Sequence, residues 1–280
     1  MKRAGIVGWP LSHSLSPVLH GYWLNQLGLE GEFVKLPAAP EDFAATIATT
    51  RAQGFTGVNV TVPHKEAAFG LADEPRPAAR IAGAANLLVF TSDGRIGADN
   101  TDSSALADSL EDELGIGSLA GKHIVLLGAG GAARGAAYGL QTRGAAKISI
   151  LNRNVDRAKN LADRIQHYLP EAKFAPRPLE DWSDVAKDAW LVINTTSAGM
   201  AGSPPLAIDL SALPQTAAVC DIVYNPLTTE FLKDAAARGH KTIDGLGMLM
   251  HQAVPSFESF FGVRPQVSPG LRAALEKALA

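Results

Sequence analysis

The chain has 280 residues, of which 46% are hydrophobic and 19% are charged, and its formal net charge is −3. This composition is typical of a globular protein with a sizeable core, and the length fits two domains or one large α/β unit. The small net charge gives no electrostatic reason to expect a nucleic acid or an anionic membrane as partner.

Strand-like and helix-like segments alternate through the first hundred residues. Short apolar runs predict strands at 4–8, 32–36 and 57–62, and the segments between and after them predict helices at 17–27, at 40–52 and just after Pro63. Two more apolar runs, 85–90 and 94–98, flank the turn at 92–94 and predict a pair of strands. The alternation predicts βαβ units and a mostly parallel sheet.

A second series of elements begins near residue 121. Apolar runs predict strands at 123–127, 147–151, 189–196 and 217–223. The glycine-rich segment 128–144 and the segment 155–167 predict helices, and so do the last forty residues. We expect one domain boundary inside 101–114 and another near Arg238–Lys241.

The turn that follows the strand at 123–127 has the spacing of a dinucleotide-binding fingerprint. Gly128 permits a tight turn, Gly130 permits close approach of a pyrophosphate, and Ala133 is small enough for close packing of helix on strand. The start of the helix then offers unpaired N–H groups to the phosphates. Sharp strand-to-helix turns also need glycine, but here the context of strand, turn and helix agrees with the spacing.

The end of the next strand indicates which dinucleotide binds. An NAD enzyme usually carries Asp or Glu there for the ribose 2′-hydroxyl, whereas this chain has Asn152, Arg153 and Asn154, with Arg157 following. Guanidinium groups pair with a 2′-phosphate, which favours NADP. Arg153, at the strand end, is the better candidate, because Arg157 also fits an ordinary exposed helix position.

These observations predict an α/β protein of two domains. Residues 1–102 with 240–280 are expected to form a discontinuous substrate and catalytic domain with a mostly parallel sheet. Residues 103–239 are expected to form a Rossmann-type NADP-binding domain.

Several polar side chains of the first domain stand where a ligand can meet them. Asn59 and Thr61 alternate along one face of a strand whose end is followed by Lys65. Open α/β sheets bind ligands beyond the carboxyl ends of their strands. Lysine serves as an acid or base when its pKa is brought toward neutrality.

Four other polar residues have a functional and a structural interpretation. Asn86 begins an apolar strand, where asparagine is disfavoured, and also suits a turn. Asp102 lies at the domain boundary and also suits a helix N-cap. Ser14 and Ser16 precede a helix, so they could cap it or hold a small anion.

Cysteine and histidine usage argues against metal sites. The single cysteine, Cys220, excludes an intrachain disulfide and a thiolate zinc site, and its apolar neighbours predict a buried thiol. The seven histidines lack the spacing of metal ligands. No apolar run reaches the length of a membrane span or marks a secretory signal, so we expect a cytoplasmic protein without a membrane partner.

The sequence resembles shikimate dehydrogenases over nearly its whole length. The matching segments, in chain order, are HSLSP, NVTVPHK, GAANLL, DNTD, GAGGAA, NRN, NTTSAGM, DIVYNP and GLGMLMHQ. The resemblance implies reversible, NADPH-dependent reduction of 3-dehydroshikimate to shikimate, a step of aromatic amino-acid biosynthesis. It also implies a small-molecule substrate and either a monomer or a homodimer.

The resemblance assigns roles residue by residue. Lys65 and Asp102 would form the acid–base pair. Ser14 and Ser16 would hold the substrate carboxylate, with Ser16 also capping the helix, since proline is favoured at the first helical position. Besides Asp102, the other substrate ligands would be Asn59, Thr61, Asn86, Tyr224 and Gln252. The contacts to NADP would come from Gly128, Ala129, Gly130, Gly131, Ala132, Asn152, Arg153, Asn154, Arg157, Ile222 and Gly245.

The chain departs from the family pattern at a few positions. Leu87 replaces a usual threonine, Ser103 and Ala105 stand where glycines are common, Asn154 replaces a threonine, and Pro77 replaces an acidic residue of some members. None of these changes removes a proposed catalytic group, so they bear on substrate preference more than on reaction type.

Two alternatives stay open. One is a quinate/shikimate dehydrogenase of broader substrate and cofactor use, against which the second serine argues, since threonine there is the change associated with quinate. The other, of a different class, is a redox sensor that binds NADP without turnover. A sensor would not need Lys65 and Asp102 in matching positions.

Overall fold

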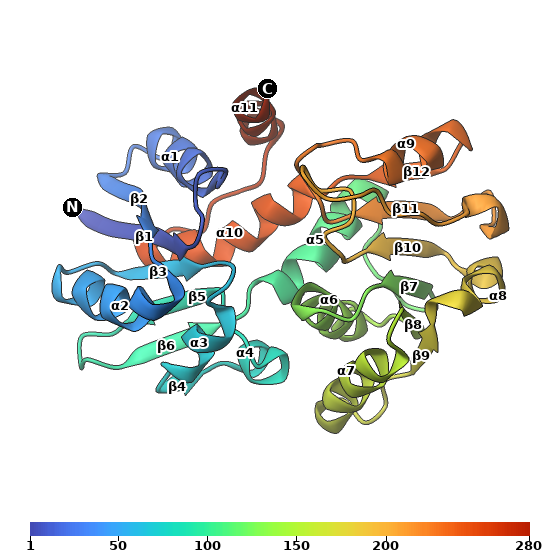
Figure 1. The fold of residues 1–280 in the computed structure, drawn as a ribbon. Coiled ribbons are helices and arrows are strands. Elements are labelled where there is room, and N and C mark those ends of the chain that lie inside the picture. The colour runs from blue at the N-terminus through green and yellow to red at the C-terminus, as the bar shows by residue number, and fades with distance from the viewer. The chain divides into compact units, whose positions relative to one another are not determined.

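The computed structural model describes residues 1–280, which form two compact units (Figure 1). The first unit comprises Met1–Thr101 and Met250–Ala280, and the second comprises Asp102–Leu249. The expected boundary at 239/240 falls inside the second unit, because β12 (Lys241–Ile243) pairs in parallel with β11 (Ala218–Asp221) and belongs to its sheet. No helix combines the length and the apolar composition needed to cross a membrane.

A six-stranded sheet in the order β2-β1-β3-β5-β6-β4 forms the centre of the first unit. Its strands are β1 (Lys2–Gly8), β2 (Gly31–Pro37), β3 (Gly57–Val60), β4 (Glu74–Pro75), β5 (Leu87–Phe90) and β6 (Ile96–Asp99). β5 runs antiparallel to β3 and β6, and the other pairings are parallel. The predicted mostly parallel sheet, with a strand pair around the turn at 92–94, is therefore confirmed.

Helices of the first unit come from both ends of the chain. They are α1 (Ser16–Gln26), the 3-10 turn η1 (Pro40–Asp42), α2 (Phe43–Ala52), α3 (Lys65–Gly70), α4 (Pro77–Ala82), α11 (Pro269–Leu279) and most of α10 (Leu246–Phe261), in which the unit boundary falls. Side chains alternate along β3: Val58 packs in one cluster with Ile47 of α2, whereas Asn59 hydrogen-bonds to Ser256 of α10. The two faces of the sheet are thus buried by different helices.

The second unit contains a parallel six-stranded sheet in the order β12-β11-β10-β7-β8-β9. Its remaining strands are β7 (His123–Leu127), β8 (Lys147–Asn152), β9 (Phe174–Pro178) and β10 (Leu191–Asn194). Numbered within the unit, this order is 6-5-4-1-2-3, the Rossmann order, in which the topology reverses between β7 and β10. Ligands of such sheets bind at the carboxyl ends of the strands beside that reversal.

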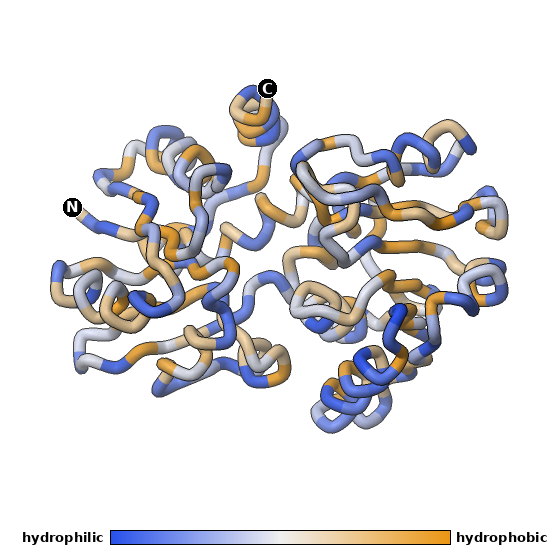
Figure 2. The backbone as a smooth tube through the Cα atoms, viewed as in Figure 1, coloured by the Kyte–Doolittle hydropathy of each residue, from blue (hydrophilic) through white to orange (hydrophobic).

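Helices and short turns cover both faces of this parallel sheet. They are α5 (Asp102–Leu114), α6 (Gly131–Thr142), α7 (Val155–Tyr168), α8 (Trp182–Val185), α9 (Glu230–Ala237) and the 3-10 turns η2 (Leu179–Asp181), η3 (Ala186–Asp188) and η4 (Leu210–Ala212). Figure 2 shows mostly apolar strands and a largely hydrophilic α7, which buries only one stripe, Ala158, Leu161, Ala162 and Ile165.

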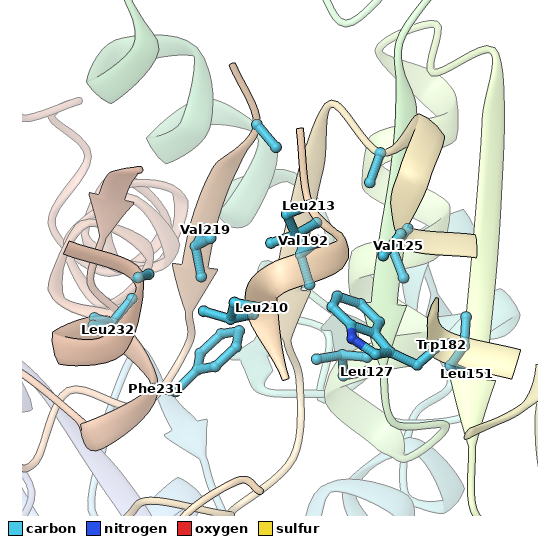
Figure 3. Packing of buried hydrophobic residues seen from close by; sticks show 14 residues of the cluster. Val125, Leu127, Leu151, Trp182, Val192, Leu210, Leu213, Val219, Phe231 and Leu232 are labelled. Carbon is cyan, nitrogen blue, oxygen red and sulfur yellow. The ribbon is translucent and has the colours of Figure 1, made fainter. Parts of the chain in front are cut away.

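An apolar cluster packs on one face of the sheet of the second unit (Figure 3). The Trp182 indole packs beside Leu127 and Leu151 and donates its N–H to the Asp209 carbonyl at 2.6 Å, so its polar atom is satisfied although the ring is buried. Cys220 of β11 is also buried, as its apolar neighbours predicted. Burial raises the pKa of its thiol well above the usual value.

Candidate functional site

Polar residues of the first unit gather at one edge of its sheet. Ser14 follows the carboxyl end of β1, and Thr61 and Lys65 follow the carboxyl end of β3. Because β5 is antiparallel to β3, its amino end lies at the same edge, and Asn86 directly precedes it. Thr101 follows the carboxyl end of β6 at this edge. The topology therefore brings together residues that stand up to 87 positions apart in the sequence (14 to 101).

The structure differs from the expectation about which of the two serines stabilises the start of the helix. The helix α1 begins at Ser16 itself, and Leu15 is its N-cap residue without a side-chain cap. The Ser14 Oγ accepts the backbone N–H of Ser16 at 3.4 Å. The prediction that Ser16 caps the helix is therefore wrong: Pro17 stands at the second helical position, and Ser16 is already inside the first turn. Ser14 stabilises the entry to the helix, and the buried Ser16 does not.

The segment around Lys65 is fixed by its neighbours on both sides. His64 is buried, its ring stacks on Phe43 at 4.5 Å, and its Nε2 lies 2.8 Å from the Ala38 carbonyl. The Lys65 carbonyl accepts the N–H of Ala85 at 2.8 Å. Lys65 is half-buried at the first position of α3. The backbone that carries this amine is thus well anchored.

Close packing at the end of β1 sets the position of Thr61. A Cβ added at Gly8 would lie 2.4 Å from the Thr61 Cγ2 and 3.2 Å from the Val62 carbonyl oxygen. The Thr61 N–H donates to the Val7 carbonyl at 2.9 Å. A glycine at the end of β1 therefore lets the threonine lie directly on the neighbouring strand.

Two carboxamides lie buried below this edge. Asn59 is 4% exposed and Asn86 is 3% exposed. The Asn59 Nδ2 donates to the Asn86 carbonyl at 3.1 Å, and the Asn86 Nδ2 donates to the Thr101 hydroxyl at 3.0 Å. Gln252 of α10 accepts the Thr101 hydroxyl through its backbone carbonyl at 2.9 Å. Three of the predicted substrate ligands, Asn59, Asn86 and Gln252, thus belong to one cluster.

His20 lies close to this cluster but is set apart by its environment. Its ring stacks on Phe33 with centroids 3.9 Å apart and meets Trp23 edge-on at 6.1 Å. It is fully buried, and neither ring nitrogen has a hydrogen-bond partner. Burial lowers the pKa of His20 from 6.5 to about 3, with the Asn59 side chain opposing the shift. The imidazole is neutral at physiological pH and is no acid–base candidate.

Asp102 begins the second unit and is the first residue of α5. Its carboxylate therefore stands in the first turn, where a negative charge is favoured by the helix dipole. Ser103, a departure from the family pattern, is buried. A Cβ added at Gly139 of α6 would lie only 1.5 Å from the Ser103 carbonyl oxygen. Helices α5 and α6 cross in contact at that point.

The glycine-rich turn after β7 has the geometry of a phosphate cradle. Gly128 has φ = +111°, a region that disfavours side chains, and a Cβ there would approach the Thr196 Cγ2 to 2.7 Å. Gly130 and Gly131 have open space where a Cβ would be, and Gly130 caps α6 without any side-chain hydrogen bond. Ala129 and Ala132 complete the turn. The first N–H groups of α6 are thus left for a ligand.

The end of β8 offers positive charge. Neither Arg153 nor Arg157 has an ion pair within the structure, and both are exposed. Asn154 caps α7 by accepting the Asp156 N–H at 3.0 Å, and the Asn152 Nδ2 donates to the Asn154 carbonyl at 2.8 Å. The two asparagines shape the turn, and the guanidinium groups fit a 2′-phosphate.

The remaining predicted cofactor contacts lie at the carboxyl ends of β11 and β12. A Cβ at Gly245 would lie 2.1 Å from the Ile222 carbonyl oxygen, so only glycine lets these two segments touch. Tyr224, two residues after Ile222, is half-buried, and burial raises the pKa of its hydroxyl.

A buried network behind this loop is missing from the sequence-based prediction. Asp221 is fully buried; its carboxylate accepts the Asn194 Nδ2 at 3.0 Å, the Val223 N–H at 3.0 Å and the Thr229 hydroxyl at 2.7 Å. Burial raises the pKa of Asp221, and these hydrogen bonds oppose the shift. The sequence does carry a signal for this network, because two apolar strands end in polar residues, Asn194 and Asp221. The network holds the loop that carries Ile222 and Tyr224.

The fold and these two sets of residues define the class of NADP-dependent oxidoreductases that pair a Rossmann unit with a separate substrate unit. No group of three or more His, Cys, Asp or Glu side chains is placed to hold a metal ion. Residues 6–88 match the family described as "Shikimate dehydrogenase substrate binding domain", and residues 110–201 match "Shikimate / quinate 5-dehydrogenase". The chain belongs to the shikimate dehydrogenase family.

Individual relatives agree with this assignment. The chain is 46% identical over 280 residues to the shikimate dehydrogenase (NADP(+)) of Methylobacterium radiotolerans, covering 99% of this chain and 98% of that one. A quinate dehydrogenase from Corynebacterium glutamicum, solved with NAD, has a TM-score of 0.90 at 32% identity, covering 99% of both chains. The shikimate 5-dehydrogenase from Thermus thermophilus, solved with NADP(H) and shikimate, has a TM-score of 0.87 at 34% identity, covering all of both chains.

Proposed function

We propose that this protein catalyses the reversible, NADPH-dependent reduction of 3-dehydroshikimate to shikimate in aromatic amino-acid biosynthesis. The observation that carries the proposal is the polar sheet edge of the first unit, where Ser14, Thr61, Lys65 and Asn86 converge within a chain of this family. The first unit is then the substrate and catalytic domain, and the second is the NADP-binding domain.

The second unit fits NADP through two independent features. The open turn at Gly130 and Gly131 would hold the pyrophosphate, and Arg153 with Arg157 would hold the 2′-phosphate. Ala129, Ala132, Asn152, Asn154, Ile222 and Gly245 would complete the contacts. When bound, NADP supplies or accepts the hydride, and the protein supplies orientation and charge.

Lys65 is the proposed general acid of the reduction. As the carbonyl carbon gains a hydride, the C=O bond becomes a C–O single bond, and the oxygen takes a proton from the Lys65 ammonium. In the reverse direction the Lys65 amine accepts the hydroxyl proton. Such a group typically contributes about 10²–10⁴-fold to the rate. Asp102 would orient the hydroxyl and the ammonium.

The other polar groups of the edge would bind and orient the substrate. Ser14 and Ser16 would hold its carboxylate by hydroxyl hydrogen bonds, and the Ser16 hydroxyl is not used as a cap of α1. Asn59, Thr61, Asn86, Tyr224 and Gln252 would bind the ring hydroxyls and the carboxylate. Holding the reacting carbon and Lys65 in one geometry removes part of the entropic barrier.

The quinate/shikimate enzyme is a second candidate, favoured by the similarity to the quinate dehydrogenase solved with NAD. Ser16 and the Arg153–Arg157 pair argue for shikimate and NADP instead. We also propose that the enzyme acts in the cytoplasm as a monomer or homodimer, without nucleic acid or membrane as partner. The free, buried Cys220 fits a reducing compartment.

The test is a set of initial rates with shikimate and quinate, each with NADP and with NAD. Turnover only with shikimate and NADP is expected. The Lys65→Ala variant should lose about 10²–10⁴-fold in rate and keep shikimate binding by calorimetry, while Lys277→Ala, at an exposed lysine of α11, should keep the wild-type rate. Turnover with quinate and NAD would favour the broader enzyme. Tight NADP binding without turnover of either substrate would contradict the proposed enzyme activity and favour the redox sensor.

A further inference from the structure

Five residues of the first unit form a closed circuit of hydrogen bonds beneath the polar sheet edge. They are Asn59 of β3, Asn86 before β5, Thr101 after β6, and Gln252 and Ser256 of α10. Thr101 and Ser256 have no assigned role in the reaction. They are 3% and 0% exposed, so neither reaches solvent directly.

One half of the circuit fixes the carboxamide of Asn59. Its Nδ2 donates to the Asn86 carbonyl at 3.1 Å and to the Ser256 Oγ at 2.8 Å. A backbone carbonyl can only accept, so the carboxamide cannot turn over without placing its oxygen against another acceptor. The Oδ1 that remains is buried, and the Asn59 side chain is also the group that opposes the lowering of the His20 pKa. Asn59 is therefore held in one orientation from α10.

The other half fixes the carboxamide of Asn86. Its Oδ1 accepts the backbone N–H of Thr101 at 2.8 Å, and its Nδ2 donates to the Thr101 Oγ1 at 3.0 Å. A backbone N–H can only donate, so this carboxamide also has a single allowed orientation. Its two groups clamp the residue that immediately precedes Asp102 in the chain.

The Gln252 carbonyl closes the circuit. It accepts the Thr101 hydroxyl at 2.9 Å and the Ser256 hydroxyl at 3.5 Å. The serine and the threonine each connect a carboxamide to the same turn of α10, from which the predicted substrate ligand Gln252 projects. Because the circuit is buried, removing one hydroxyl takes one hydrogen-bond acceptor away from a carboxamide nitrogen, which weakens the hold on that side chain.

We propose that Thr101 and Ser256 are positioning residues of this dehydrogenase. They set the orientation of the Asn59 and Asn86 carboxamides and the place of the backbone leading into Asp102. The proposal rests on the proposed function, since it concerns how the substrate-side groups are held for that reaction. Neither hydroxyl needs to touch substrate.

The experiment compares Thr101→Val with a matched control, Thr50→Val. Thr50 lies in α2, is also 3% exposed, and also donates its hydroxyl to a backbone carbonyl, that of Thr46, at 2.7 Å. Both variants remove one buried hydroxyl from the same unit without changing side-chain shape. Thr101→Ser keeps the hydroxyl, and Ser256→Ala tests the other half of the circuit.

Thr101→Val is expected to lower kcat/KM for shikimate by about 10- to 100-fold, with a loss in kcat and not only a rise in KM. Thr101→Ser should recover most of the loss, Thr50→Val should stay within about twofold of wild type, and the two valine variants should melt within a few degrees of each other. Ser256→Ala should lower kcat/KM in the same direction, which keeps the test valid if Thr101→Val does not fold.

The proposal is overturned if Thr101→Val and Ser256→Ala turn over shikimate as fast as Thr50→Val. It is also overturned if Thr101→Ser is as slow as Thr101→Val, because the methyl group rather than the hydroxyl would then matter. Wild-type protein that fails to turn over shikimate would instead contradict the proposed function, so the two failures are distinguishable.

Discussion

The buried His20 should make the first unit sensitive to acid. In the unfolded chain a histidine has a pKa near 6.5, whereas burial among Trp23, Phe33 and Phe257 lowers the pKa of His20 to about 3. The folded state therefore resists protonation and the unfolded state does not. The associated stability is fully present above pH 6.5 and is lost progressively as the pH falls toward 3.

The size of the effect follows from proton linkage. Between pH 7 and pH 5 the unfolded state gains a proton that the folded state does not take up. With pKa values of 6.5 and about 3, this costs about 2 kcal/mol of the free energy of unfolding. No charged group contributes to the shift, so the cost comes from desolvation opposed only by Asn59.

The assay is urea unfolding at pH 7 and pH 5, followed by tryptophan fluorescence, because Trp23 lies edge-on to His20. His20→Phe should reduce the loss between the two pH values by about 2 kcal/mol, whatever its effect on absolute stability. His167→Gln, at an exposed histidine of α7, is the control for removing one imidazole and should keep the wild-type loss. An identical pH dependence in wild type and His20→Phe would refute the argument.

Four further substitutions test the packing and the charge described above. Gly8→Ala places a Cβ 2.4 Å from the Thr61 Cγ2 and should lower kcat/KM for shikimate about tenfold, measured by initial rates beside the melting temperature. Gly139→Ala forces α5 and α6 apart and should cost about 1–3 kcal/mol in urea unfolding, whereas Gly21→Ala, in open space on α1, should gain up to about 1 kcal/mol. Arg153→Ala should raise the KM for NADP about tenfold or more and leave the KM for NAD unchanged, so equal effects on both cofactors would contradict a contact to the 2′-phosphate.

Most of the fold could be predicted because its central strands are continuous apolar runs. The sequence missed β4, β9 and β12, which have two, five and three residues. β4, β9 and β12 lie at sheet edges, and β9 contains Pro176 and Pro178, which usually argue against a strand. Missing β12 moved the expected domain boundary to 240, ahead of the strand that belongs to the second sheet.

The candidate site divides in a similar way. The turn at Gly128 was predictable because a dinucleotide-binding turn is recognised from the local spacing of its glycines and from one required backbone conformation. Which serine stabilises the start of α1 was not predictable, because the helix begins one residue earlier than expected. That shift changes which hydroxyl accepts a hydrogen bond from the first N–H groups. The roles of Thr101 and Ser256 depend on partners 151 and 197 positions away, and no sequence pattern contains that information.

The discontinuity of the first unit has a consequence for how the chain matures on the ribosome. Residues 102–249 form a unit that is continuous in sequence, so they can fold as soon as they emerge. The first hundred residues cannot complete their core at that stage, because His20, Trp23 and Phe33 pack against Phe257 and Phe260, which are synthesised after the second unit. At about 5–20 residues per second, the nascent N-terminal segment waits roughly ten seconds or more with an aromatic surface exposed.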